Sequence, residues 1–243
     1  MFELILLGCC IGLLSGFFGI GGGTILVPAL LLLGFDIKVA IGISVVQMIF
    51  SSVYGSYLNF KKGTLDAIMV LAIGLGGFCG AFLSGVITSN ISDENLELFF
   101  LTFVSFALIR VFFSPKEYKE QKDVAKWILV IIGFIIGGLS MSIGVGGSLL
   151  LVPILVGFLH VPLKQATSAG LFFVVFSSVS GFISHFLSGH VDYESGVVIG
   201  LASLVGVYVG VHLKHKVDVI IQKRLLIVFY FIVVIYLVKR IFF

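Results

Sequence analysis

The sequence predicts an all-α polytopic membrane protein made of two homologous halves, each with one helix interrupted by glycines. Hydrophobic residues make up 59% of the chain and charged residues only 11%, so the chain cannot present a water-soluble surface. Several apolar runs reach the length of about 20 residues that one helical membrane span requires. A glycine-rich motif also occurs twice, once in each half of the chain.

Apolar segments follow one another along the chain, and we expect each of them to be helical. The only long polar stretch, 114–126, lies between the fourth and the fifth, and its charges of mixed sign are typical of a solvated loop. It divides the chain into an N-terminal repeat, 1–113, and a C-terminal repeat, 127–243. The apolar segments are approximately 2–34, 39–60, 65–88, 95–113, 127–159, 163–187, 192–213 and 219–242.

The two halves match residue by residue. The motif LLSGFFGIGGGTILVP at Leu13–Pro28 recurs as LSMSIGVGGSLLLVP at Leu139–Pro153, at an offset of 125 residues. Further along, FSSVYG at Phe50–Gly55 matches FSSVSG at Phe176–Gly181, at an offset of 126. Matched glycines, prolines and serines in one register are a stronger signal than two apolar helices alone. Internal repeats of this size are typical of transporter folds.

The first and fifth segments are too long for one membrane crossing and too short for two. In the first, residues 3–18 would form a helix of about 24 Å and residues 24–33 one of about 15 Å, at 1.5 Å per residue. The glycines between them favour a break, because glycine adopts non-helical backbone conformations readily. Such a segment either crosses once with an unwound middle, or enters the membrane and returns to the same side.

The basic residues favour the re-entrant alternative. If each broken segment returns, the halves have opposite orientations, and 12 of the 15 Lys and Arg residues share one side of the membrane. Only Lys38, Lys239 and Arg240 lie on the other side. Positive residues concentrate on the cytoplasmic side of membrane proteins. We therefore predict inverted repeats in the cytoplasmic membrane, with the linker 114–126 in the cytoplasm and both termini outside.

The glycine motifs are the candidate substrate site. Broken helices at equivalent positions of two halves indicate a transport site, and each second half-helix presents unpaired backbone N–H groups and a partial positive charge. Two such helix starts facing each other would bind an anion without a buried Lys or Arg. Polar residues of segments two and six would complete the site, of which Gln47 is the most informative. The expected substrate-binding residues are Gly19, Gly21, Gly22, Gly23, Thr24, Gln47, Ser51, Gly144, Gly146, Gly147, Ser148 and Ser177.

Other residues of these segments have simpler structural interpretations. Gly8, Gly12 and Gly16 have the spacing of closely packed membrane helices, and the glycines of segments three and seven share it. A serine within a helix commonly bonds its own backbone, so each single serine has a structural alternative. Asn59 and His185 occupy equivalent positions in the two halves, and His185 is interpreted as a hydrogen-bonded structural residue. Asp66 and Asp192, which open segments three and seven, are interpreted as helix caps.

Several classes of function find no support in the sequence. Cys9, Cys10 and Cys79 all lie in apolar segments, without the spacing of a disulfide framework or a zinc site. No Cys, His, Asp and Glu cluster suits a metal, no nucleophile pairs with a base, and no basic and aromatic patch suits a nucleic acid. We therefore predict no cofactor, no metal, no catalytic residue and no nucleic-acid partner. The basic residues are expected in loops, and the core is expected to hold no carboxylate and no arginine.

The repeated G-x-G-G…V-P motif, the FSSV-x-G segment and the G-x-x-D sequence that opens segments three and seven resemble the sulfite exporter TauE/SafE family of prokaryotic membrane proteins. The resemblance runs from about Gly12 to the end of the last segment. It implies transport of a small anion, such as sulfite, thiosulfate or a sulfonate. The motif residues that match are Gly19, Gly21, Gly22, Pro28, Gly144, Gly146, Gly147 and Pro153. Ser148 stands where the first copy has Gly23, so the two half-sites need not be equal.

Together these observations predict a secondary carrier or facilitator for a small anion, with the lipid bilayer as its surroundings. An anion channel on the same scaffold is the first alternative, and a membrane enzyme or assembly scaffold is the second. The identity of the anion, the direction of transport, coupling to protons or sodium, and homo-oligomerisation are left open by the sequence.

Overall fold

A computed structural model describes residues 2–62, 67–113, 124–189 and 191–242, and within these ranges every regular element is an α-helix. The predicted breaks and segment boundaries are confirmed to within a few residues. The helices are α1 (Phe2–Phe18), α2 (Gly23–Leu32), α3 (Ile37–Lys61), α4 (Ala67–Ala81), α5 (Ser84–Asn90), α6 (Asp93–Phe113), α7 (Lys126–Ser142), α8 (Ser148–Gly157), α9 (Leu163–Leu187), α10 (Tyr193–Lys216) and α11 (Val219–Phe242).

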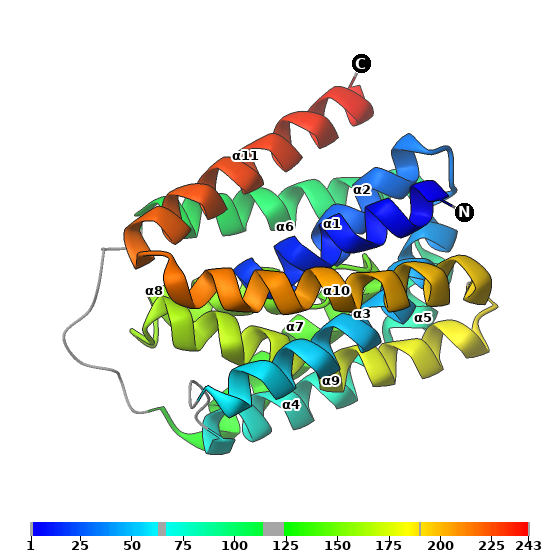
Figure 1. Cartoon of the computed structure of the whole chain (residues 1–243). Coiled ribbons are helices and arrows are strands. Elements are labelled where there is room, and N and C mark those ends of the chain that lie inside the picture. The colour runs from blue at the N-terminus through cyan, green and yellow to red at the C-terminus, as the bar shows by residue number, and fades with distance from the viewer. Residues whose placement is uncertain (1, 63–66, 114–123, 190, 243) are drawn as a thin grey trace.

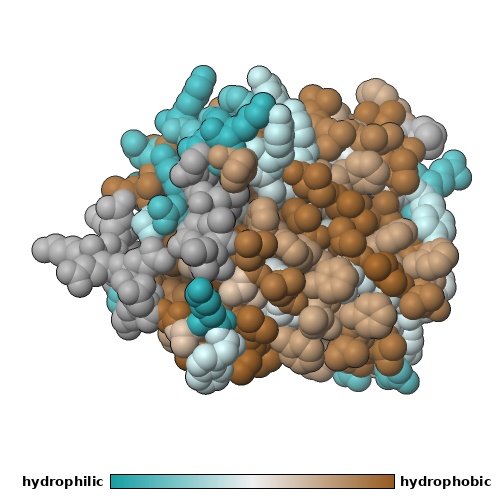
Figure 2. All heavy atoms as spheres, turned by 90° about the horizontal axis from the view of Figure 1, so that it is seen from below, coloured by the Kyte–Doolittle hydropathy of each residue, from teal (hydrophilic) through white to brown (hydrophobic). Residues whose placement is uncertain are grey.

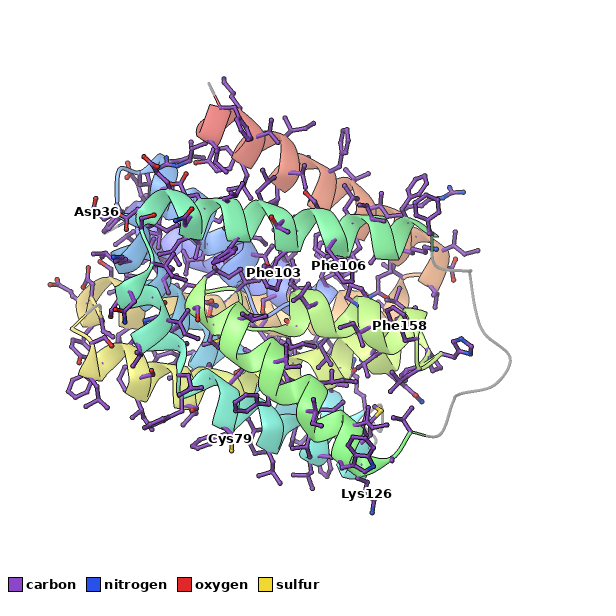
Figure 3. All side chains as sticks on the ribbon, turned by 180° about the vertical axis from the view of Figure 1, so that it is seen from behind. Asp36, Cys79, Phe103, Phe106, Lys126 and Phe158 are labelled. Carbon is purple, nitrogen blue, oxygen red and sulfur yellow. The ribbon has the colours of Figure 1, made fainter. Side chains whose placement is uncertain are left out.

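Both broken segments enter the bundle and turn back. Figure 1 shows both chain termini at one end of the bundle, which we call the terminal end, and α1 and α2 both have their outer ends there. Helices α7 and α8 have their outer ends at the opposite, linker end. Figure 3 shows the same separation, with Asp36 at one end and Lys126 and Phe158 at the other. This is the arrangement expected for re-entrant segments.

The remaining helices account for the membrane-spanning length of the fold. In the described ranges, six helical stretches are long and apolar enough to cross a bilayer, and one of them joins α4 and α5 as Met69–Asn90. Figure 2 shows a broad apolar surface along the bundle, with hydrophilic residues gathered toward its ends. At the terminal end, Lys38 lies 3.6 Å from Asp93 and Arg240 lies 3.0 Å from Glu97. A continuous apolar surface between polar ends is typical of a protein surrounded by lipid.

The two halves exchange their first helices. Helix α1 packs most extensively against α10 of the second half, and α7 packs against α4 of the first half. The contact is close because glycines line it, as predicted. A Cβ added to Gly12 would overlap the backbone of Ser203, and one added to Gly80 would overlap that of Phe134. Small residues let helix backbones approach closely in membranes, where van der Waals packing drives association.

Gly80→Ala should destabilise the fold, because the added methyl group would meet the Phe134 carbonyl of α7 rather than a movable side chain. Overpacking of this kind costs about 1–3 kcal/mol or more. The matched control is Gly138→Ala on the facing helix, whose added Cβ would lie 3.2 Å from its nearest neighbour, the Gly80 carbonyl oxygen. We expect the melting temperature in detergent to fall clearly for Gly80→Ala and little for Gly138→Ala. Equal melting temperatures would contradict this account of the interface.

Some details of segments three and seven differ from each other. The first half has a turn at Phe82 and Leu83 that separates α4 from α5, whereas α10 is continuous, and this break was not predicted. Asp192 caps α10 as predicted, because its carboxylate accepts a hydrogen bond from the backbone N–H of Ser195. Asp66, for which a helix cap was predicted, lies outside the described residues, as does most of the linker 114–126.

Candidate functional site

The breaks in the two re-entrant segments are made by glycines in a conformation that other residues avoid. We call residues 19–22, between α1 and α2, the first glycine connection, and residues 143–147, between α7 and α8, the second. In the first, Gly19, Gly21 and Gly22 have φ of 71°, 74° and 83°; in the second, Gly144, Gly146 and Gly147 have φ of 69°, 79° and 74°. L-residues with a side chain rarely adopt these values. The repeated motif therefore encodes the same backbone turn twice.

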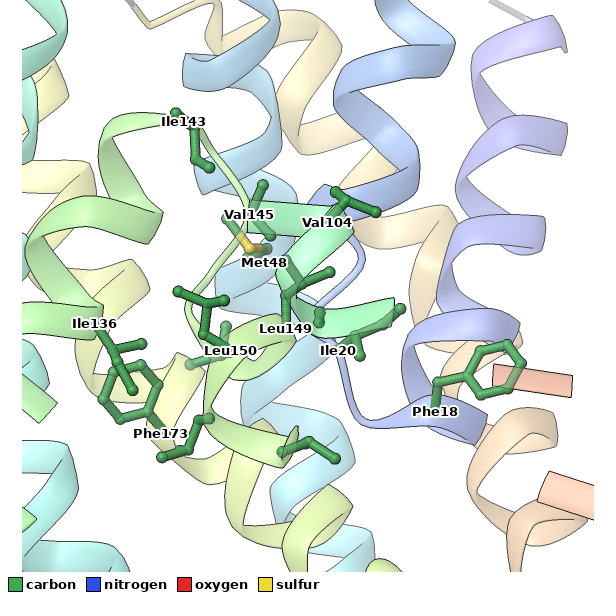
Figure 4. Close-up of a cluster of buried hydrophobic side chains, with 14 of the residues drawn as sticks. Phe18, Ile20, Met48, Val104, Ile136, Ile143, Val145, Leu149, Leu150 and Phe173 are labelled. Atoms are coloured by element: carbon green, nitrogen blue, oxygen red, sulfur yellow. The ribbon is translucent and has the colours of Figure 1, made fainter. Parts of the chain in front are cut away.

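The two glycine connections meet at the centre of the bundle. A Cβ on Gly23 would overlap the carbonyl oxygen of Gly144, and Met48 of α3 lies beside both Gly21 and Gly146. The hydroxyl of Ser44 on α3 donates a 2.8 Å hydrogen bond to the Gly144 carbonyl. Figure 4 shows the apolar side chains around this meeting point, with Met48 and Val145 close together. The residues of both connections are buried.

The starts of α2 and α8 carry no side-chain cap. Their N-cap residues are Gly22 and Gly147, neither of which has a side chain to accept the first N–H groups. Helix α2 runs from the centre to the terminal end and α8 runs from the centre to the linker end. Two positive helix ends therefore lie near each other at the middle of the bundle.

Three polar side chains beside these helix starts have no hydrogen-bond partner in the described part of the chain. They are the hydroxyls of Thr24 and Ser148 and both amide atoms of Gln47, and all three side chains are fully buried. The Gln47 amide is directly beside the first connection, because a Cβ on Gly22 would lie 2.7 Å from its Oε1. Leaving a buried polar group unpaired costs about 1–3 kcal/mol. These unpaired polar atoms make the region beside the two helix starts the candidate binding site.

The opposite ends of the breaks are satisfied by side chains. At the end of α1, Gln222 of α11 donates a 3.1 Å hydrogen bond to the Phe17 carbonyl. At the end of α7, Thr88 donates a 2.8 Å hydrogen bond to the Ser142 carbonyl, and His185 Nε2 lies 3.1 Å from the Met141 carbonyl oxygen, which agrees with the structural role predicted for this histidine. The carbonyl ends are thus capped by the protein while the N–H ends are not, and this contrast favours an anion.

The two half-sites are unequal, as the substitution of Ser148 for Gly23 led us to expect. A side chain at Gly23 would collide with Gly144 and with Ser44 Oγ, so the first copy has no room for a serine there. In addition, the repeat equivalent of Gln47 is Phe173, which packs against the second connection beside Gly147. Figure 4 shows Phe173 next to Ile136. The polar lining is therefore concentrated on the side of Gln47.

The predicted serines lie near the connections but mostly bond their own helices. Ser177 Oγ lies 3.4 Å from the Gly146 carbonyl and 3.2 Å from the Phe173 carbonyl, so it contacts the second connection. Ser51 Oγ lies 3.4 Å from the carbonyl of Met48 on its own helix, which is the structural alternative. Ser44 was not predicted, although its hydrogen bond to Gly144 joins α3 to the second connection.

One expectation about charge is wrong. Lys214 does not lie in a loop: α10 continues to Lys216, and the Lys214 side chain is fully buried. Its ammonium group donates 2.8 Å hydrogen bonds to Asn59 Oδ1 and to Ser168 Oγ. The sequence prediction failed because a lysine at the end of an apolar segment resembles an ordinary loop residue. Within the described ranges, no three His, Cys, Asp or Glu side chains gather in a way that could hold a metal ion.

Comparison with known proteins agrees with this architecture. A family model described as "Sulfite exporter TauE/SafE" matches residues 4–237. The chain is 28% identical to the probable membrane transporter protein YunE of Bacillus subtilis, over 88% of this chain and 89% of the relative. It is 27% identical to the probable membrane transporter protein YdhB of the same organism, over 90% of this chain and 93% of the relative. It is 22% identical to a probable membrane transporter protein of Methanocaldococcus jannaschii, over 88% of this chain and 86% of the relative. No solved structure matches.

Proposed function

Because the chain belongs to the sulfite exporter TauE/SafE family of membrane transporters, we propose that it carries a small anion across the cytoplasmic membrane and that the anion binds between the two glycine connections. A sulfur oxyanion or sulfonate such as sulfite or thiosulfate is the proposed substrate class. The observation that carries this proposal is the pair of uncapped helix starts beside three unpartnered polar side chains.

The proposed site binds the anion mainly with backbone groups. The first N–H groups of α2 and α8 would donate to the oxyanion, and the partial positive charge of each helix start would stabilise its negative charge. The hydroxyls of Thr24 and Ser148 and the NH₂ of Gln47 would add donors. Such a set suits a small tetrahedral or pyramidal oxyanion, which offers several acceptor atoms in a compact volume.

The proposed mechanism is alternating access by a carrier. Both connections are buried, so an anion reaches them only if the surrounding helices move apart. The re-entrant segments come from opposite ends of the bundle, and the halves in our proposal are inverted repeats with the linker 114–126 in the cytoplasm and the termini outside. Rocking of one half against the other would then expose the site to one end at a time. This favours a carrier over an open channel, and transport without chemical change over an enzymatic role.

A thermal-shift screen of the purified protein tests the proposed site. Anions that bind only the folded state raise its melting temperature, so we expect shifts with thiosulfate, sulfite or a sulfonate and none with the matching chloride salts. Thr24→Val and Ser148→Ala remove one donor each and should weaken the shift, because a hydrogen bond to a charged group contributes about 1.5–3 kcal/mol. A screen in which neither oxyanions nor sulfonates stabilise the wild-type protein would refute the proposal.

A flux measurement separates the carrier from the channel. In proteoliposomes a carrier must cycle between conformations, which takes microseconds to milliseconds or longer. Thiosulfate on the far side should therefore accelerate uptake of labelled thiosulfate by exchange, whereas a channel would show no such acceleration.

A further inference from the structure

Lys214 is a buried positive charge that the proposed anion site does not yet use. Its side chain is fully buried within α10, near the linker end of the bundle. The ammonium group donates to Asn59 Oδ1 of α3 and to Ser168 Oγ of α9, both at 2.8 Å, and these two atoms are themselves 3.0 Å apart. Three helices of the bundle therefore converge on this one charge.

The partners of Lys214 do not neutralise it. An amide oxygen and a hydroxyl are uncharged acceptors, and the ion pairs found in the described part of the chain join Lys38 to Asp93 and Arg240 to Glu97 instead. Lys62 and Lys164 are close enough to repel the Lys214 charge. A buried charge is costly unless it is paired. Among the residues that the structure describes, the charged groups that act on Lys214 are thus positive, and no carboxylate is paired with it.

The fold does not require a charge at this position. The residue equivalent to Lys214 in the first half, at the offset of 126, is Thr88, which is buried and donates to the Ser142 carbonyl. Asn59 likewise has His185 as its equivalent. Packing at the equivalent place in the first half is therefore achieved without a lysine, so the ammonium group at the other end calls for a different explanation.

Lys214 is also connected to the glycine connections through α9. Its partner Ser168 is followed on the same helix by Gly170, where an added Cβ would lie 2.9 Å from the Gly19 carbonyl and 3.0 Å from Ser148 Cβ. Thr167, which directly precedes Ser168, lies against Gly19, where an added Cβ would overlap the Thr167 backbone carbonyl. The partner of Lys214 and the residues that contact the candidate site therefore lie within a single turn of α9.

We propose that Lys214 is a second anion-binding group, on the route between the linker end and the glycine connections. This inference rests on the proposed function, and the ligand of Lys214 is the same small oxyanion that the glycine connections bind. The ammonium group would donate a charge-assisted hydrogen bond to the oxyanion, and the anion would supply the missing negative charge. Lys62 and Lys164 would raise the local concentration of anions at this end.

Replacement of the charge tests the inference. Lys214→Met should fold with an unchanged or higher melting temperature, because well-packed apolar residues can replace buried charges without loss of stability. Its dissociation constant for thiosulfate should nevertheless rise about tenfold or more, as expected when one partner of a buried charge pair is removed. Lys214→Arg keeps the charge and should bind within a few-fold of wild type. Thr88→Val, at the equivalent position, should keep wild-type affinity.

The outcomes separate this inference from the proposed function. Lys214→Gln, which retains hydrogen-bonding atoms without the charge, is the second variant if the methionine variant does not fold, and it should show the same loss of affinity. Wild-type affinity in a folded Lys214→Met or Lys214→Gln protein would overturn the inference while leaving the glycine site intact. If the wild-type chain itself binds no oxyanion, both proposals fail together.

Discussion

Gly22→Ala should abolish anion binding and transport while most of the protein remains folded. Two effects combine at this position. The backbone has φ 83°, which costs an L-residue with a side chain roughly 1–2 kcal/mol, and the new methyl group would lie 2.7 Å from Gln47 Oε1. The amide is the flexible end of a side chain, so it would turn away. The site would then lose both its open helix start and its amide donor.

Backbone strain alone is controlled by Gly34→Ala. Gly34, between α2 and α3, has a similar φ of 87°, but an added Cβ would meet nothing within 4 Å. Both variants should therefore lose comparable stability from strain, and only Gly22→Ala should lose the thiosulfate-induced thermal shift and the uptake of labelled thiosulfate. A folded Gly22→Ala protein with a normal shift would show that the first glycine connection does not bind the anion.

Gln47→Leu should weaken anion binding without destabilising the ligand-free protein. Both polar atoms of the Gln47 amide are buried without a partner in the described residues, so their removal should leave the ligand-free protein as stable as wild type or more so. An apolar side chain is already accommodated at the equivalent position, Phe173. Affinity for thiosulfate should fall about tenfold or more, because the amide is the largest polar group beside Gly22.

The matched control for this variant is Gln222→Leu. Gln222 is also fully buried, but its amide caps the Phe17 carbonyl at the end of α1. Its loss should lower the melting temperature and leave the affinity of the folded protein close to wild type. If Gln47→Leu instead loses stability and keeps its affinity, Gln47 is a structural residue and the polar lining of the site lies elsewhere.

The positions of the helices were predictable because glycine, proline and apolar length act locally. The motif at Leu13–Pro28 and its repeat specify a break by the conformational freedom of glycine alone. The preference for re-entrant segments came from the distribution of Lys and Arg, and Figure 1 shows that α2 turns back toward the outer end of α1 and α8 toward the outer end of α7. Helix-packing glycines such as Gly206, which lies against Cys9, were predictable from their spacing of four.

The remaining features depend on contacts between distant segments, which spacing does not reveal. Lys214 is buried only because α3 and α9 bring Asn59 and Ser168 to it. The caps of the broken helices by Gln222 and Thr88 likewise join residues that are far apart in the chain. The repeat itself contained a usable signal, because Lys214 opposite Thr88 and Gln47 opposite Phe173 are polar or charged departures from an otherwise matched pattern.

The exchange of first helices between the halves has a consequence for biogenesis. Helix α1 is synthesised before the other described helices, yet the surface that it packs against, α10, is synthesised about 190 residues later. Until then its glycine-lined face must be shielded by lipid or by the insertion machinery. In a polypeptide released after residue 113, α1 would lack its packing partner α10, and α4 would lack its packing partner α7. We therefore expect quality-control proteases to degrade this half rather than let it accumulate.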